Sequence, residues 1–183
     1  DIYMIPESCQ NADIRLYKSI EFPLKWEFEK QLMADVDAAD TMLFKNDNIW
    51  FMLTNICSAQ MGDHQSELHI FYSEDFKSSV WKPIENGNPV IFDPLKGRNG
   101  GFFEHNGKLY RVNQVHGQAH YGKSFNVNEI EVLSKEQYVE KEVSIVQPNF
   151  KDSSISTHHF NANGKVAAVD FARMERLRKA IRS

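Results

Sequence analysis

The clearest indication of the fold is the segment Gly100-Gly-Phe-Phe-Glu-His-Asn-Gly-Lys-Leu-Tyr-Arg-Val-Asn-Gln114. Two short runs rich in apolar and aromatic residues flank Asn106-Gly107, and Asn-Gly between two such runs is a strong signal for a β-hairpin. The glycine supplies the positive φ that a tight turn needs. We therefore predict antiparallel strands over residues 100–103 and 108–114.

The same unit recurs along the chain. Further hairpins are predicted over residues 40–44 with 49–55 and 156–160 with 165–170, and residues 1–7 resemble the second half of one. Third and fourth strand-like runs follow at 13–17, 26–29, 68–72, 81–83, 121–133 and 138–143. Units of four antiparallel strands that recur about every 50 residues are typical of β-propeller blades.

We therefore predict an all-β, five-bladed β-propeller-like domain over residues 1–170, with its N-terminal blade missing from the chain. A meandering β-sandwich is the alternative, but it does not explain the repeated hairpin. The tail over residues 171–183 differs, because its apolar residues fall near helical spacing among five Lys and Arg residues. It is predicted to form a short amphipathic helix that docks on the domain.

Composition excludes several classes of function. The 183 residues carry a net charge of −4 and 42% are apolar, with a pI of about 6.0. An acidic chain of this kind is not expected to bind nucleic acid, and its apolar runs are too short to span a membrane. Cys9 and Cys57 form no disulfide framework. Without a signal peptide or a glycosylation motif, a cytoplasmic location is the default expectation.

A phosphate-binding pattern, G-x-x-x-x-G-K-[ST], occurs at Gly117-Gln-Ala-His-Tyr-Gly-Lys-Ser124. Such a loop needs a helix after it, so that the helix N-terminus can hold the phosphate. Residues 125–133 are instead β-branched and roughly alternating, which predicts a strand. We interpret the match as a coincidence and predict no cofactor.

Two carboxylates hold equivalent places at the starts of neighbouring units. Glu7 and Asp40 could converge at the axis of a propeller, where ligands bind to the ends of the innermost strands. Glycoside chemistry needs such a pair, one protonated as the acid and one ionised as the base or nucleophile. They are the candidate catalytic residues. Alternatively, Asp40 caps a turn and Glu7 lies in a solvated loop.

Polar and aromatic residues at comparable positions are candidates for substrate binding. Arg98 suits an anionic group, or it forms an ion pair with Asp40 instead. The remaining candidates, for hydroxyl groups or for stacking on a sugar, are Asn99, Gln114, Tyr110 and His158. The aromatic residues of the strands are otherwise expected to form the core.

The histidines do not predict a metal site. His158 and His159 are adjacent, and adjacent residues of a strand face opposite sides, so only one of them can point into a pocket. His116 and His120 lie among glycines that favour a loop over a metal-binding helix. An axial ion held by lone ligands and water is the alternative.

Several segments together resemble a known family. They are Asp1–Ser8, Ile14–Tyr17, Phe22–Trp26, Asp40-Thr41, Leu68–Ser73, Trp81–Pro83, Asn88–Val90, Arg98–Phe103, Leu109–Arg111, Gln114, Tyr121-Gly122 and Asn128–Ile130. This pattern resembles the N-terminal domain of glucosamine inositolphosphorylceramide transferases and of bacterial proteins of sugar metabolism. That domain is similar to the five-bladed propellers of arabinanase-like glycoside hydrolases. In those transferases the glycosyltransferase chemistry is attributed to a separate downstream domain.

The chain departs from the family pattern at two motifs. It has Arg98-Asn-Gly-Gly101 where the family has Arg-Pro-Ala-Gly, and Val115 where an acidic residue is expected. A valine cannot accept a proton or bind a sugar hydroxyl, which argues against hydrolysis.

The sequence therefore predicts a module that recognises a glycan or sugar conjugate and is accessory to carbohydrate-active enzymes. Two alternatives are an active glycoside hydrolase or transferase and a structural scaffold. Because incomplete blades expose strand edges, we also expect a homodimer or a partner chain that completes them.

Overall fold

The computed structural model describes residues 1–58, 62–117 and 120–174. Within these ranges the protein is all-β, as predicted, with antiparallel sheets and no α-helix. A single turn of 3-10 helix, η1, covers Cys9–Asn11. No helix in this part of the chain is long and apolar enough to cross a membrane.

Three sheets account for most of the strands. The first has the order β1-β2-β3, with β1 (Tyr3–Met4), β2 (Asp13–Glu21) and β3 (Lys25–Ala34). The second has the order β4-β5-β6-β7, with β4 (Ala38–Asn46), β5 (Ile49–Ile56), β6 (Glu67–Ser73), β7 (Lys82–Pro83), and β8 (Ile91–Phe92) paired with β6. The third is β9 (Asn99–His105), β10 (Lys108–Gly117), β11 (His120–Leu133) and β12 (Tyr138–Val146) in sequence order.

The last unit is built differently. Here β13 (Ser154–Ser156) pairs with β16 (Ala172–Arg173), while β14 (Phe160–Ala162) pairs with β15 (Ala167–Val169). The predicted hairpin over 156–160 and 165–170 is therefore confirmed only in its inner part, because Thr157–His159 separate the two short strands. Thr157 donates its backbone N–H to the carbonyl of Gly122, outside any ladder within the unit.

The predicted C-terminal helix is wrong at its start. Ala172 and Arg173 pair with Ser156 and Ser154, so their backbone groups belong to a sheet. The apolar spacing of the tail is a weaker determinant than this pairing. Residues 175–183, the rest of the predicted helix, lie outside the described residues.

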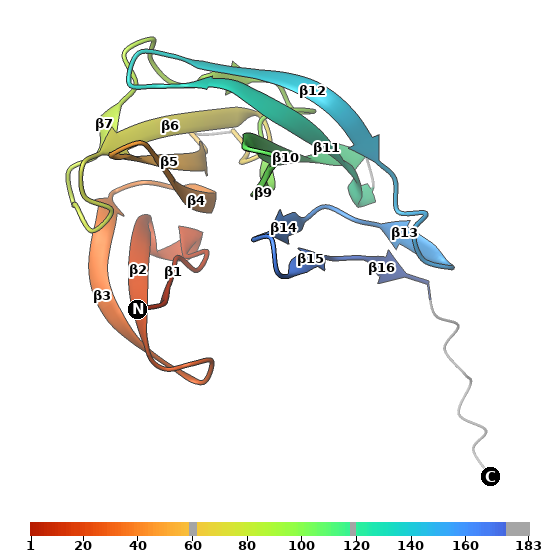
Figure 1. The fold of residues 1–183 in the computed structure, drawn as a ribbon, viewed down its shortest axis with the longest axis horizontal. Helices are drawn as coiled ribbons and strands as arrows, with labels where there is room; N and C mark the ends of the chain where they lie inside the picture. Colours follow the sequence, from red (N-terminus) through yellow and green to blue (C-terminus); the bar gives the residue numbers. More distant parts are fainter. Residues whose placement is uncertain (59–61, 118–119, 175–183) are drawn as a thin grey trace.

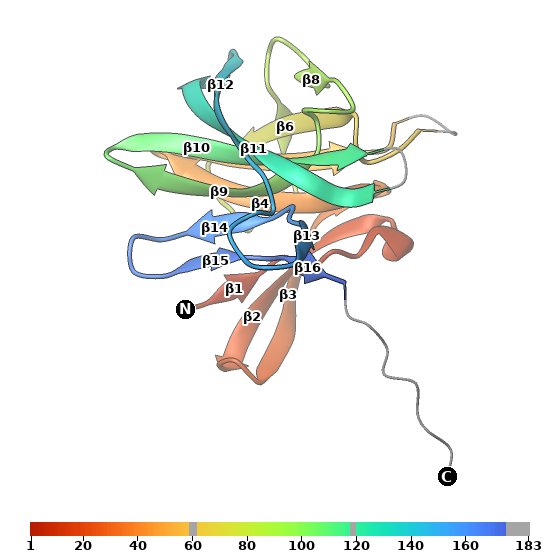
Figure 2. The same ribbon diagram turned by 90° about the vertical axis from the view of Figure 1, so that its right-hand side faces the viewer.

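The sheets are arranged around a common centre (Figure 1), with β1, β4, β9 and β14 nearest to it and β3 and β12 on the outside. In the perpendicular view of Figure 2, the turns of the β9–β10 and β14–β15 hairpins lie on the same side of the molecule. The arrangement brings the starts of β4 and β9 together with the segment before β14.

The core lies between successive sheets. On β5, Met52 packs into an apolar cluster with Ile14 and Leu16 of the first sheet, whereas Phe51 and Leu53 pack into a second cluster. That second cluster also contains Leu133 of the third sheet. Neighbouring residues of a strand face opposite sides, so the side chains of this one strand pack against both adjacent sheets. Full burial of each such side chain contributes about 1.5–3 kcal/mol.

The segment that matched a phosphate-binding loop continues into β11. Residues 125–133 form a strand, as predicted, and the helix that a phosphate-binding loop requires is replaced by this strand. The predicted strand is therefore confirmed.

Candidate functional site

Asp40 lies at an irregular point of β4, where the pairing with β5 shifts between Ala39 and Met42. Its φ is 48°, a left-handed conformation that aspartate tolerates better than most residues. The irregularity turns the carboxylate toward β9 and β10. There Oδ2 accepts hydrogen bonds from Arg98 Nε at 2.7 Å and from Gln114 Nε2 at 3.3 Å.

Asn99 joins the same cluster through backbone groups. Its Nδ2 donates to the carbonyl of Asp40 at 3.0 Å, and its own carbonyl accepts from Gln114 Nε2 at 2.6 Å. Its backbone N–H donates to Asn55 Oδ1 at 2.8 Å. The structure thus brings together four residues selected from the sequence, and buried amides hold them in place.

A buried ion pair lies next to this cluster and contacts it. Arg111 is fully buried and donates from Nε and Nη2 to the two carboxylate oxygens of Glu140, both at 2.7 Å. Its remaining donors reach the carbonyl of Lys96 at 2.8 Å and Asn99 Oδ1 at 3.3 Å. Because Arg111 bonds to both sides of Arg98, it fixes the backbone that carries the guanidinium.

Arg98 forms the ion pair with Asp40 that the sequence offered as an alternative to anion binding. Burial lowers the pKa of Arg98, but the nearby Asp40 carboxylate outweighs it, with smaller contributions from Tyr121 and Glu7, so the net shift is upward. The guanidinium carbon lies 5.9 Å from the centre of the Tyr121 ring. Arg98 is therefore a permanent cation, and its counter-charge is the carboxylate of Asp40 in the same protein.

A cavity of about 510 Å³ opens beside this cluster. Glu7 and Asp40 both line it, so the two candidate catalytic carboxylates share one space, as their equivalent sequence positions suggested. The other lining residues are Tyr3, Ile5, Thr41, Met42, Asn99, Gly101, Phe102, His159 and Asn161. This size is within the range of small-molecule sites.

Two glycines allow the last unit to approach this cavity closely. A Cβ on Gly100 would lie 2.5 Å from the carbonyl oxygen of His158, and one on Gly101 would collide with the carbonyl of Phe160. Gly101 also has φ of 120°, where side-chain-bearing residues are strained. The departure from the family pattern at Gly100 therefore coincides with a backbone contact between β9 and the segment before β14.

Of the two adjacent histidines, His159 lines the cavity, whereas the sequence selected His158. Neither residue lies on a strand, so the alternation rule used to separate them does not apply. Both backbone N–H groups instead donate to Asp170 Oδ1, at 3.0 Å from His158 and 2.7 Å from His159. Asp170 Oδ2 lies 2.5 Å from His158 Nδ1.

Asp170 was not selected from the sequence, because its role depends on a contact with backbone groups that the closing hairpin creates.

The His158 ring packs edge-on against Tyr121 at 4.9 Å, and Tyr121 stacks on His116 at 4.7 Å. Burial lowers the pKa of His116, and the positive charge of Arg98 lowers it further. Burial raises the pKa of Tyr121. The rings of His116 and Tyr121 are therefore uncharged at neutral pH and form a wall beside Arg98.

Tyr110 lies apart from the Asp40 cluster. Its ring stacks on Phe103 at 5.0 Å, and Phe103 packs edge-on against Phe160 at 5.2 Å. This is the core role expected for most of the aromatic residues.

Among the described residues, no group of three or more His, Cys, Asp or Glu side chains is placed to hold a metal ion.

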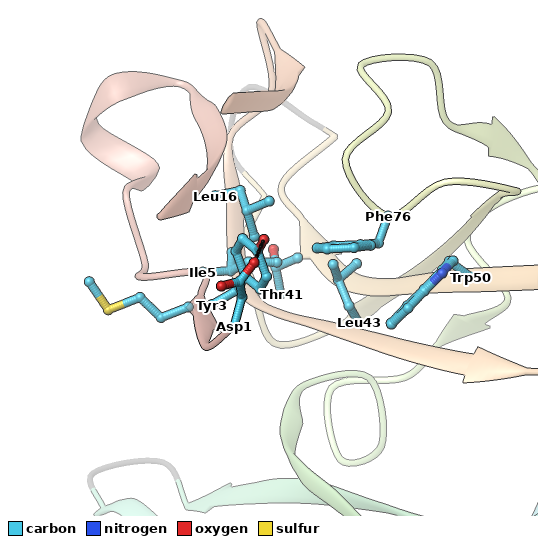
Figure 3. A pocket seen from close by; sticks show the side chains of 9 residues that line it. Asp1, Tyr3, Ile5, Leu16, Thr41, Leu43, Trp50 and Phe76 are labelled. Carbon is cyan, nitrogen blue, oxygen red and sulfur yellow. Dashed lines mark hydrogen bonds between the residues drawn. The ribbon is translucent and has the colours of Figure 1, made fainter. Parts of the chain in front are cut away.

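A second cavity, of about 460 Å³, lies between the first two sheets (Figure 3). Its walls are largely apolar and include Tyr3, Trp50 and Phe76, with the ammonium of Lys77 4.7 Å from the centre of the Tyr3 ring. It shares Tyr3, Ile5 and Thr41 with the first cavity but contains neither Asp40 nor Glu7.

The fold and the site define an all-β domain of antiparallel sheets with a polar cavity where the inner strands meet. The family described as "Glucosamine inositolphosphorylceramide transferase 1, N-terminal" matches residues 1–173, and the chain belongs to that family. This confirms the resemblance to that N-terminal domain.

Plant proteins are among the relatives. The chain is 33% identical over 169 residues to glucosamine inositolphosphorylceramide transferase 1 of Arabidopsis thaliana, covering 88% of this chain and 22% of that protein. It is 31% identical over 183 residues to the protein of the same name from Oryza sativa subsp. japonica, covering 93% of this chain and 24% of the relative. The chain thus spans less than a quarter of the length of these relatives.

Proposed function

We propose that this chain is a recognition module for a glycan or sugar conjugate and that it serves a carbohydrate-active enzyme. Its sheets would form the blades of a five-bladed propeller of the arabinanase-like type, and the ligand would bind at the axis. The single observation that carries the proposal is the cavity beside the Asp40–Arg98–Gln114 cluster, which is lined by two carboxylates and two side-chain amides.

The chemistry of the cavity suits hydroxyl groups. Carboxylates accept hydrogen bonds, amides both accept and donate, and each sugar hydroxyl can do both. The apolar residues Ile5, Met42 and Phe102 supply surfaces against which the C–H face of a sugar can pack. The plant relatives carry glucosamine, a sugar, in their name, which supports a sugar-containing ligand.

The test is a glycan array probed with the wild-type chain, with Asp40→Asn and with Asp47→Asn. Asp47 is a matched control, because it lies at the tip of the same hairpin, also has positive φ (53°), and is exposed to solvent. We expect binding by the wild type and by Asp47→Asn, and a loss of at least tenfold for Asp40→Asn. Absence of binding to any glycan would favour the scaffold alternative.

One observation favours an enzymatic alternative: Glu7 and Asp40 line the same cavity. A glycoside hydrolase would use one as the acid and the other as the base or nucleophile. Release of the dye from aryl glycosides, abolished by Glu7→Gln, would support it. Binding without release would leave recognition as the function.

A further inference from the structure

The orientation of the Asn161 side chain is fixed by a backbone group. The N–H of Phe102 on β9 donates to Asn161 Oδ1 at 2.9 Å. A backbone N–H can only donate, so the atom facing it must be the amide oxygen. A flipped amide would place its NH₂ group against this N–H.

Asn161 in turn fixes the protonation of His159. With its oxygen held by Phe102, the amide presents Nδ2 to His159 Nε2 at 2.6 Å. An amide NH₂ can only donate, so Nε2 must be the unprotonated, accepting nitrogen. The proton of the neutral ring is then on Nδ1. No hydrogen bond from another described residue engages Nδ1.

We propose that His159, locked as the Nδ1–H tautomer, supplies an uncharged hydrogen-bond donor to the cavity. Asp40 and Glu7 supply the hydrogen-bond acceptors of the same cavity. The ligand class that fits is a neutral polyol, in which one hydroxyl donates to a carboxylate and a neighbouring hydroxyl accepts from His159. The assignment of the tautomer stands on the protein alone, whereas the ligand class rests on the proposed function.

Burial keeps the His159 ring neutral. It lowers the pKa of the ring below the ordinary value of 6.5, and the carboxylate of Asp170 opposes this shift, with smaller effects from His158, which lowers the pKa, and from Asp40, which raises it. Protonation would place a second N–H against the amide of Asn161. Because the folded pKa is depressed, the contribution of His159 to stability is full above about pH 6.5 and is lost as the pH falls through the folded value.

The tautomer can be read directly from the long-range ¹H–¹⁵N correlations of the histidine rings. In the wild type at neutral pH we expect the His159 signals, assigned by their loss in His159→Asn, to show an unprotonated Nε2 and a protonated Nδ1. In Asn161→Asp one carboxylate oxygen still accepts from Phe102, but the other faces Nε2 as an acceptor. This variant should therefore protonate Nε2 and raise the pKa of His159.

Asn163→Asp is the matched control, because Asn163 lies exposed in the turn of the same hairpin and its Oδ1 accepts from Lys165 N and Val166 N. It should leave the tautomer and the pKa of His159 unchanged. A protonated Nε2 in the wild type at neutral pH, or an unchanged tautomer in Asn161→Asp, would overturn the assignment. Neither readout requires a ligand.

The ligand class is tested separately, by calorimetric titration with a neutral methyl pyranoside and with the corresponding uronate. We expect the neutral sugar to bind at least tenfold more tightly, because the uronate would add a third carboxylate beside Asp40 and Glu7. Equal affinity would overturn the ligand class. Absence of binding by both probes would count against the proposed function and the ligand class and leave the tautomer standing.

Discussion

Gly101 is a residue at which the third sheet and the last unit approach each other closely. It combines a positive φ with a position where a Cβ would collide with the carbonyl of Phe160. Gly107, in the turn of the same β9–β10 hairpin, also has positive φ but has no atom within 4 Å of its Cβ position. Substitutions at Gly101 and Gly107 therefore distinguish the cost of backbone strain from the cost of a steric clash.

Gly101→Ala should destabilise the protein clearly more than Gly107→Ala. We expect about 1 kcal/mol for Gly107→Ala, from the left-handed backbone alone. For Gly101→Ala we expect about 3 kcal/mol or more, because β14 must also move. The free energies of unfolding from denaturant titration would show this difference. Equal losses would mean that β14 shifts freely and does not fix the cavity.

At the scale of elements, the hairpins were predictable because they depend on local signals. Asn106-Gly107 and the apolar runs beside it are local signals for β9 and β10, and the structure has both strands. Asp40, Arg98, Asn99 and Gln114 were selected because they hold comparable positions in the repeated units. Their contacts follow from that placement.

The remaining parts of the site depend on contacts between distant segments. Asp170 acts on backbone groups that face it only after the β14–β15 hairpin has closed. The tautomer of His159 depends on Asn161 and Phe102, which belong to different sheets. Ala172 and Arg173 pair with β13 against their helical spacing, because the backbone groups of β13 are within reach only in the folded chain.

The pair formed by Arg111 of β10 and Glu140 of β12 ties two strands that flank β11. Glu140→Gln should destabilise the protein by about 3–5 kcal/mol, because it leaves a buried guanidinium without a counter-charge. Glu129→Gln is the matched control, since Glu129 pairs with the exposed Lys108 on the neighbouring strand. Thermal unfolding should show almost no change for the control. Similar melting temperatures would mean that water compensates Arg111.

At the scale of the whole molecule, the sheets differ in completeness. Counted over the described residues, the middle sheets have four and five strands, whereas the first has three and the last unit consists of two-stranded sheets. Strands with unpaired sides present free N–H and C=O groups to other chains. In the last unit, the residues of β15 are exposed as well.

We therefore expect self-association at high concentration, seen in light scattering coupled to size exclusion as a mass above 21.2 kDa. Val169→Lys, on the exposed strand β15, should shift the protein toward the monomer because a charge at an edge opposes pairing. Val166→Lys, in the adjoining turn, makes the same change off the strand and should retain association. A wild-type monomer at every concentration would contradict the expectation.

Asp170 closes the β14–β15 hairpin at its base, with one carboxylate oxygen on the backbone of both histidines. At the other end of the hairpin, Gly164 has open space around it. The position of His159 is therefore independent of the number of residues at the tip. Insertions and deletions between residues 163 and 165 can accumulate, or be engineered, without displacing the ring. This hairpin offers a place to graft loops of different lengths.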